Sequence, residues 1–247
     1  MKKLFALLLI GIMILGCSSN KKENVAAPES SAQPQKQEEV AQEEVTQEEP
    51  VDIPTKKELT LEDLEITEYK VEVLDSTEYV LAIKNNSELT AELHINATAY
   101  DAEGNMIGSD NGSIDVIGAG EQSCMHLYFM DVTGIDHIEY EKSLQYTTNT
   151  LYDPVLNNLS VQENCNGDVL TLAVTNNGDK AAMFVEAYAI FMDAAGNPLQ
   201  ISNTYIVDSN HEIAPGAMVS AQLSYYSSYD KGAYDHVTWY LTGRAEK

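Results

Sequence analysis

Residues 79–105 have the sequence YVLAIKNNSELTAELHINATAYDAEGN, and the pattern of this segment predicts the fold class. From Ala91 to Ala99, small and aliphatic side chains alternate with polar ones, the period of two expected of a strand buried on one face. From Tyr79 to Ile83 almost every side chain is apolar, which predicts a strand buried on both faces. The Asp and Gly of residues 101–105 suit a tight hairpin turn. An antiparallel β structure follows.

Four landmarks of this region return in the same order in the second half of the chain. The offset between the copies grows from 91 to 99 residues, which indicates a duplication with small loop insertions. By the same alternation, we expect a second long strand whose buried face carries Met183, Val185, Ala187 and Ala189. The matching segments are Lys84–Ser87 with Thr175–Gly178, Tyr100–Asn105 with Met192–Asn197, Ile117–Gly120 with Ile213–Gly216, and Asp136–Ile138 with Asp235–Val237.

The two copies predict an all-β chain of two tandem antiparallel β-sandwiches. Strand-like runs bounded by Gly, Asn and Pro at this spacing indicate roughly seven strands per copy. We place repeat 1 at residues 61–147 and repeat 2 at residues 154–245, with the link between them at 147–154. Each copy is long enough to bury one small core.

The first 17 residues, MKKLFALLLIGIMILGC, predict a lipoprotein signal peptide over residues 1–16. Lys2 and Lys3 precede an apolar run that is shorter than the ~20 residues a spanning helix needs. Residues 14–17 resemble the bacterial lipobox, which implies that Cys17 is acylated and becomes the new N-terminus. Two acyl chains are enough for stable anchoring. An ordinary secreted protein and an uncleaved anchor are the alternatives.

Residues 17–60 predict a lipidated Cys followed by a disordered Gln/Glu-rich linker. Its segment 31–50, SAQPQKQEEVAQEEVTQEEP, has almost no large apolar residues and cannot bury enough surface to offset the entropy of ordering. Such a linker would carry the sandwiches away from the lipid. We therefore expect the protein on the extracytoplasmic face of a bacterial membrane, at the cell surface or in the periplasm.

Residues 79–121 are similar to the FxLYD-type domain of bacterial envelope proteins, and residues 169–223 fit the same outline. The similarity consists of an Asn-Asn-Ser/Gly turn, a long strand, a Tyr-Asp-x-x-Gly hairpin and a Pro-Gly-Glu turn. Met192 departs from the aromatic residue of the hairpin, and residues 119–120 depart from Pro-Gly. The resemblance implies immunoglobulin-like sandwiches used as accessory or interaction modules, and it carries over no catalytic residue.

Charge and motifs narrow the function. The chain has 14 Lys and Arg against 39 Asp and Glu, a net charge of −25, which argues against a nucleic-acid partner. No GxSxG, HExxH or phosphate-binding Gly loop is present, so we expect no enzyme activity and no cofactor. His137 and His236 recur at matching places, which a duplicated structural position explains most simply. Cys124 and Cys165 either form one bridge or, as we favour, remain two buried free thiols.

Two local groups are candidate binding sites. Asp101, Glu103 and Asn105 offer oxygens to Ca²⁺ within one turn, but Ca²⁺ takes six to eight oxygens and hairpin chemistry explains these residues better. An aromatic surface is the second candidate, because tyrosines suit contacts with a protein or a glycan. It contains Tyr225, Tyr226, Tyr229 and Tyr234. Trp239, by contrast, is expected in the core.

The sequence thus predicts a membrane-anchored extracytoplasmic lipoprotein that acts as a non-enzymatic interaction or spacer module of the cell envelope. Its partners would be the membrane, through the lipid on Cys17, and an envelope protein or cell-wall glycan. The alternative is a glycan- or calcium-binding envelope protein. An accessory or inhibitor acting through exposed strand edges is a third option.

Overall fold

The computed structural model describes residues 58–226 and 232–247, which lie in one compact unit, Thr55–Lys247. The predicted signal peptide, Cys17 and nearly all of the predicted linker lie outside the described residues. The strands of the first half are β1 (Leu64–Val73), β2 (Ser76–Asn85), β3 (Ala91–Tyr100), β4 (Met106–Ile117), β5 (Gln122–Phe129), β6 (His137–Glu139) and β7 (Gln145–Thr147). The second half contains β8 (Tyr152–Asp153), β9 (Leu159–Asn166), β10 (Val169–Asn176), β11 (Ala182–Met192), β12 (Pro198–Tyr205), β13 (Glu212–Ile213), β14 (Met218–Ser224) and β15 (His236–Glu246).

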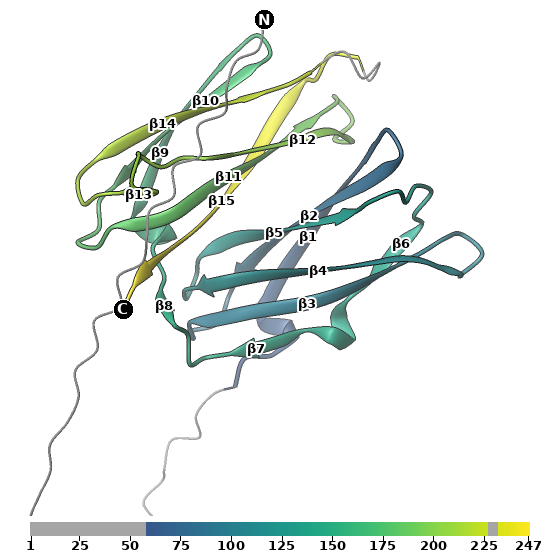
Figure 1. The fold of residues 1–247 in the computed structure, drawn as a ribbon, viewed down its shortest axis with the longest axis horizontal. Helices are drawn as coiled ribbons and strands as arrows, with labels where there is room; N and C mark the ends of the chain where they lie inside the picture. Colours follow the sequence, from purple (N-terminus) through teal and green to yellow (C-terminus); the bar gives the residue numbers. More distant parts are fainter. Residues whose placement is uncertain (1–57, 227–231) are drawn as a thin grey trace, which may run out of the picture. The chain divides into compact units, whose positions relative to one another are not determined.

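Within the described residues the chain is all-β with antiparallel sheets, as predicted (Figure 1). The helices there are single 3-10 turns, namely η1 (Leu61–Asp63), η2 (Glu141–Ser143) and η3 (Leu156–Asn158). No helix in the described ranges has the length and apolar character needed to cross a membrane.

Strands β1–β7 form a first sandwich. One sheet has the order β1-β2-β5 and the other the order β4-β3-β6, with β7 also paired to β3. The alternating run in β3 is confirmed, because Ala91 to Ala99 are buried at every second position and the residues between them are partly or fully exposed. Leu59 packs in the same core, so the packed region begins two residues before the predicted boundary at residue 61.

Strands β8–β15 form a second sandwich from the sheets β14-β10-β9 and β12-β11-β15-β8, with β13 paired to β11. Val185, Ala187 and Ala189 are buried as predicted, whereas Met183 is only partly buried. A β-bulge between Met183 and Glu186 breaks the alternation here, since it inserts a residue into one strand of the pair. Phe184, with φ of 52°, lies within the bulge and is partly exposed.

The corresponding long strands β3 and β11 have matching neighbours in the two sandwiches. In the first, β6 and β7 pair with opposite ends of β3 and are separated by η2. In the second, the single strand β15 runs along β11 from Met192 to Met183. The last strand of the repeat is therefore interrupted in one copy and continuous in the other.

A buried Asn holds the same turn in each sandwich. Asn85 Nδ2 donates to the Leu89 and Gly118 carbonyls at 2.7 and 3.1 Å. Asn176 Nδ2 donates to the Lys180 and Ile213 carbonyls, both at 2.8 Å. Each Asn Oδ1 accepts the backbone N–H two residues later. Buried backbone groups need such partners, so the Asn-Asn landmark of the sequence is a structural one.

A third cluster of buried residues joins the two sandwiches. It combines Val80 and Cys124 of the first sandwich with Tyr188, Ile190 and Met192 of the second. The sheet faces that form it turn away from each sandwich's own core, and β15 lies beside β5 (Figure 1). This is why β2 and β11 are buried on both faces. We call this cluster the joining core.

Candidate functional site

A groove of about 510 Å³ lies between the two sandwiches, next to the joining core. One wall comes from β4 and β5, and the other from β11, β12 and β15. No single repeat could therefore form it alone. Its lining includes Asn111, Ser113, Asp115, Cys124, His126, Phe184, Glu186, Tyr188, Tyr205, Thr242 and Arg244.

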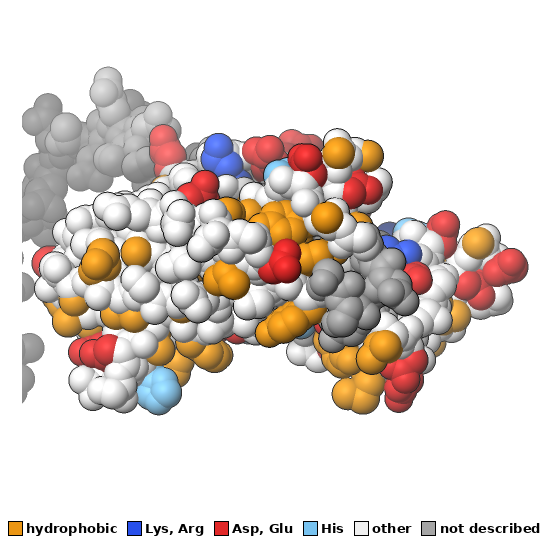
Figure 2. All heavy atoms as spheres, turned by 90° about the horizontal axis from the view of Figure 1, so that it is seen from above, with side chains coloured by type: hydrophobic (Ala, Val, Ile, Leu, Met, Phe, Trp, Pro, Cys, Tyr) orange, Lys and Arg blue, Asp and Glu red, His pale blue; other side chains and the backbone are white. Residues whose placement is uncertain are grey.

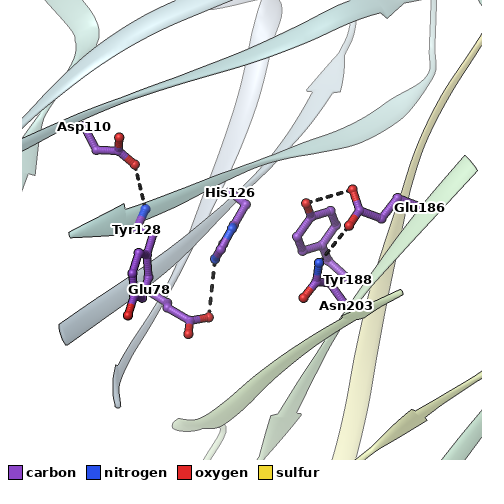
Figure 3. Close-up of polar contacts among 7 residues, drawn as sticks. All are labelled: Glu78, Asp110, His126, Tyr128, Glu186, Tyr188 and Asn203. Carbon is purple, nitrogen blue, oxygen red and sulfur yellow. Dashed lines mark hydrogen bonds and ion pairs between the residues drawn. The ribbon is translucent and has the colours of Figure 1, made fainter. Parts of the chain in front are cut away.

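Two hydrogen-bonded groups, one from each sandwich, contribute side chains to the groove (Figure 3). On the first sandwich, His126 Nε2 lies 3.3 Å from Glu78 Oε2. On the second, Glu186 accepts hydrogen bonds from the Tyr188 hydroxyl at 3.0 Å and from Asn203 Nδ2 at 2.7 Å. The rings of His126 and Tyr188 have their centroids 5.5 Å apart, so the two groups meet across the boundary between the sandwiches.

Arg244 forms one end of the groove and is the single arginine of the chain. Its guanidinium carbon lies 4.2 Å from the centre of the Tyr152 ring and 4.6 Å from that of Phe184, within the reach of cation–π attraction. Its Nη1 forms an ion pair with Asp115 of the first sandwich. Arg244 therefore connects the bulge of β11 to strand β4, while its buried Nε has no partner among the described atoms.

Burial sets the protonation state of two groups that line the groove. Burial raises the pKa of the Cys124 thiol, and Glu186 nearby raises it further, so the thiol stays protonated at neutral pH. Burial likewise raises the pKa of the Tyr188 hydroxyl, which stays a hydrogen-bond donor to Glu186. Partly exposed aromatic rings and fixed carboxylates remain as contacts for a ligand.

The structure separates the residues of the predicted tyrosine surface. Tyr225 is buried and its hydroxyl donates to the Gly232 carbonyl, while its ring packs against Phe191 and Tyr234. Tyr225 belongs to the second core, whereas Tyr234 is partly buried and packs against it. Tyr226 is exposed, and Tyr229 lies outside the described residues. Trp239 packs against the same core, as expected.

The candidate calcium turn is a self-contained hairpin. Asp101 Oδ1 accepts the N–H groups of Glu103 and Asn105, and Oδ2 accepts Asn105 Nδ2 at 2.9 Å. Asp193 makes the same three bonds in the second copy, although Ala195 replaces Glu103 there. These hydrogen bonds, led by the Asn amide, lower the pKa of both aspartates. The turn thus uses the Asp oxygens that a metal would need.

The recurring histidines also have a structural explanation. Asp136 N donates to the Tyr100 carbonyl, and Asp235 N donates to the Met192 carbonyl, both at 2.8 Å. Each following His bonds the side chain of that Asp. The Asp-His segment therefore marks the end of the β3–β6 pairing in the first copy and of the β11–β15 pairing in the second.

Cys124 and Cys165 are both free thiols in the structure. Cys124 is buried in the joining core, as the favoured sequence interpretation required. Cys165 is exposed on β9, so the expectation that it would be buried was wrong. The edge position of β9 in its sheet explains this exposure.

No protein-family model and no curated protein matches the chain. Among solved structures, it is similar to red sea bream transglutaminase, with 14% identity over 73% of this chain and 29% of the other, at a TM-score of 0.23. It is also similar to the C-terminal globular domain of an oligosaccharyltransferase from Pyrococcus abyssi, with 12% identity, coverages of 75% and 47%, and a TM-score of 0.21. The chain spans less than half of either structure. At these TM-scores neither likeness bears on function.

Proposed function

We propose that the protein is an extracytoplasmic lipoprotein, anchored through Cys17, whose paired sandwiches act as a non-enzymatic interaction or spacer module of the cell envelope. The lipobox-like residues 14–17 and the acidic linker support the anchored location. The similarity to FxLYD-type domains supports the immunoglobulin-like, tandem character of the module. The N-terminal features that support the anchor and the domain similarity that supports the module lie in different parts of the sequence and are independent of each other.

One observation carries the module itself, and it is the joining core. Val80 and Ile190, one from each sandwich, are fully buried there, and the Tyr69 and Tyr240 hydroxyls hydrogen bond across it at 2.7 Å. Glu121 of the first sandwich accepts the Asn157 N–H at the start of the second at 3.0 Å. A pair of sandwiches fastened at these points holds its outer surfaces at a fixed spacing, which a spacer or scaffold requires.

Replacement of Cys17 by serine tests the anchored location. We expect the wild-type protein in the membrane fraction and labelled by a fatty-acid probe, because two acyl chains hold it there. The Cys17→Ser protein should lose the label and either keep its uncleaved signal peptide or leave the membrane. Cys165→Ser is the matched control and should keep both label and location. An unlabelled wild-type protein would contradict the proposal.

Glycan binding in the groove is the second candidate function. The exposed ring of Tyr205, the half-exposed ring of Phe184 and the fixed carboxylate of Glu186 resemble the mixed aromatic and polar surface that sugars favour. We therefore propose the groove, rather than the predicted tyrosine surface, as the glycan site of this alternative.

Two tyrosines of equal exposure separate these locations. Tyr205 in the groove is 56% exposed, and Tyr226, a residue of the predicted tyrosine surface, is 57% exposed. If the groove binds glycan, Tyr205→Ser should weaken retention of residues 55–247 on purified cell-wall glycan about tenfold, a typical loss for one aromatic contact, and Tyr226→Ser should not. Loss through Tyr226→Ser alone would instead assign binding to the sequence-predicted surface.

A further inference from the structure

Three connections of the first sandwich meet at one end: the β1–β2 turn, the β3–β4 hairpin and the β5–β6 loop (Figure 1). Asp131 N donates to Ser76 Oγ at 3.1 Å, and Thr77 Oγ1 donates to the Val132 carbonyl at 2.7 Å. On the hairpin side, a Cβ at Gly108 would lie 3.2 Å from Val132. The β5–β6 loop is therefore held between the other two connections.

A large exposed apolar side chain lies on the β1–β2 turn, on the β5–β6 loop and on the first residue of β4, next to the hairpin. Leu74 is 85% exposed, Met106 is 70% exposed and Met130 is 66% exposed. None of the three packs against a core of its own sandwich. Exposed apolar side chains on three neighbouring segments are more typical of a binding surface than the same number of isolated ones.

Leu74 is held in a backbone conformation that disfavours its side chain. Val73 pairs with Ser76, so Leu74 and Asp75 form a two-residue hairpin turn. The φ of Leu74 is 56°, and the first position of such a turn with positive φ favours glycine. The Leu side chain gains no packing to offset this strain. Strain without a structural benefit points to a contact with another molecule.

Acidic residues surround these side chains. Asp75, Glu103, Asp131 and Asp136 are exposed on the same three connections, and Lys70 is the one Lys or Arg within residues 70–76, 100–107 and 128–137. The Lys70 ammonium donates to the Ile135 carbonyl, so it is turned toward the loop. Figure 2 shows acidic and hydrophobic side chains next to one another at one end of the molecule.

We propose that this end, the acidic tip (Leu74, Met106, Met130, Asp75 and Asp131), binds a cationic segment of another protein that also carries apolar side chains. The inference rests on the proposed function as an interaction module and names the surface and partner chemistry. Charge complementarity selects this occupant. A second copy of the chain brings the same excess of acid, and an anionic lipid surface repels the tip in the same way.

The test uses residues 55–247, which contain all three cores in one compact unit. The probe is a fluorescent peptide of Lys, Leu and Ser, compared with one in which Glu replaces Lys and one in which Ser replaces Leu. We expect saturable binding of the Lys-Leu peptide alone, measured by anisotropy at physiological salt. Binding of all three peptides, or of none, would overturn the proposal.

Variants then locate the site. Leu74→Gly with Met130→Ser should weaken binding of the Lys-Leu peptide at least about tenfold, as expected when two anchors of one patch are removed. The Leu74→Gly protein should melt no lower than the wild type, because glycine suits a positive φ. Asp75→Asn with Asp131→Asn should weaken binding and reduce its salt dependence.

The matched control is Met218→Ser, since Met218 is 60% exposed but lies on β14 of the second sandwich. It should bind like the wild type. An equal loss in this control, unchanged binding by the tip variants, or preferential binding of the protein to phosphatidylglycerol vesicles would overturn the proposal. Failure here leaves the Cys17→Ser result unaffected, so the anchor and the tip are judged separately.

Discussion

Replacement of Ile190 by glutamate should separate the unfolding of the two sandwiches. Ile190 is fully buried in the joining core and belongs to neither sandwich's own core. An unpaired carboxylate there would cost several kcal/mol, so the interface should open and let the charge reach water. The loss of the buried Ile side chain alone removes about 1.5–3 kcal/mol of stabilisation. We therefore expect two thermal transitions in the variant where residues 55–247 of the wild type show one.

Ile190→Val is the control for this experiment. It removes one methyl group, which typically costs 0.5–1.5 kcal/mol, about enough to lower the melting temperature by a few degrees. The single transition should remain. A single transition at an unchanged temperature in Ile190→Glu would mean that the joining core contributes nothing to stability.

Replacement of Asn176 by alanine should destabilise the second sandwich by about 3 kcal/mol. The amide satisfies the Lys180 and Ile213 carbonyls and the Gly178 N–H, at 2.8 to 2.9 Å. Each buried group left without a partner costs about 1–3 kcal/mol, so the loss is large even if water reaches one of them. Urea denaturation should show a lower midpoint with an unchanged slope.

The neighbouring Asn177 provides a matched control. It is exposed, and its amide donates to Ser160 Oγ at 3.0 Å and more weakly to Asn158 O. Asn177→Ala should cost less than about 1 kcal/mol, as expected for an exposed hydrogen bond. Asn85→Ala should match Asn176→Ala, because the first sandwich has the same arrangement. Equal effects at Asn176 and Asn177 would contradict the structural role of the landmark.

Local features of the fold could be predicted from the sequence because local sequence determines them. The alternation in β3 depends only on which side of one strand faces the core, and it was predicted correctly. The Asp101 and Asp193 hairpins use hydrogen bonds within five residues, so their sequence predicts their geometry. In β11 the predicted alternation holds less well, because the bulge exposes Phe184 and every residue from Ala187 to Met192 is buried.

Features that depend on contacts between the sandwiches could not be predicted in this way. The apolar residues of β2 indicated burial on both faces, but nothing local shows that β11 covers the second face. The groove combines Asp115 and Arg244, which are 129 positions apart, so no local sequence motif predicts the groove. The one usable signal was that Arg244 is the single arginine. Tyr225 shows the converse limit, because a group of tyrosines close together in sequence does not reveal which ring is buried in the core.

A distance measurement between the two sandwiches tests whether the joining core holds them in one fixed arrangement. Spin labels would be attached to Cys165, which is exposed on the second sandwich, and to a cysteine introduced by Ser109→Cys on β4 of the first. Cys124 is buried and its thiol stays protonated, so it should remain unlabelled. If the joining core holds the sandwiches together, pulsed electron paramagnetic resonance will give one narrow distribution of distances between the labels, and this distribution will broaden in the Ile190→Glu protein. A broad distribution of distances in the protein that keeps Ile190 would contradict a fixed arrangement of the two sandwiches.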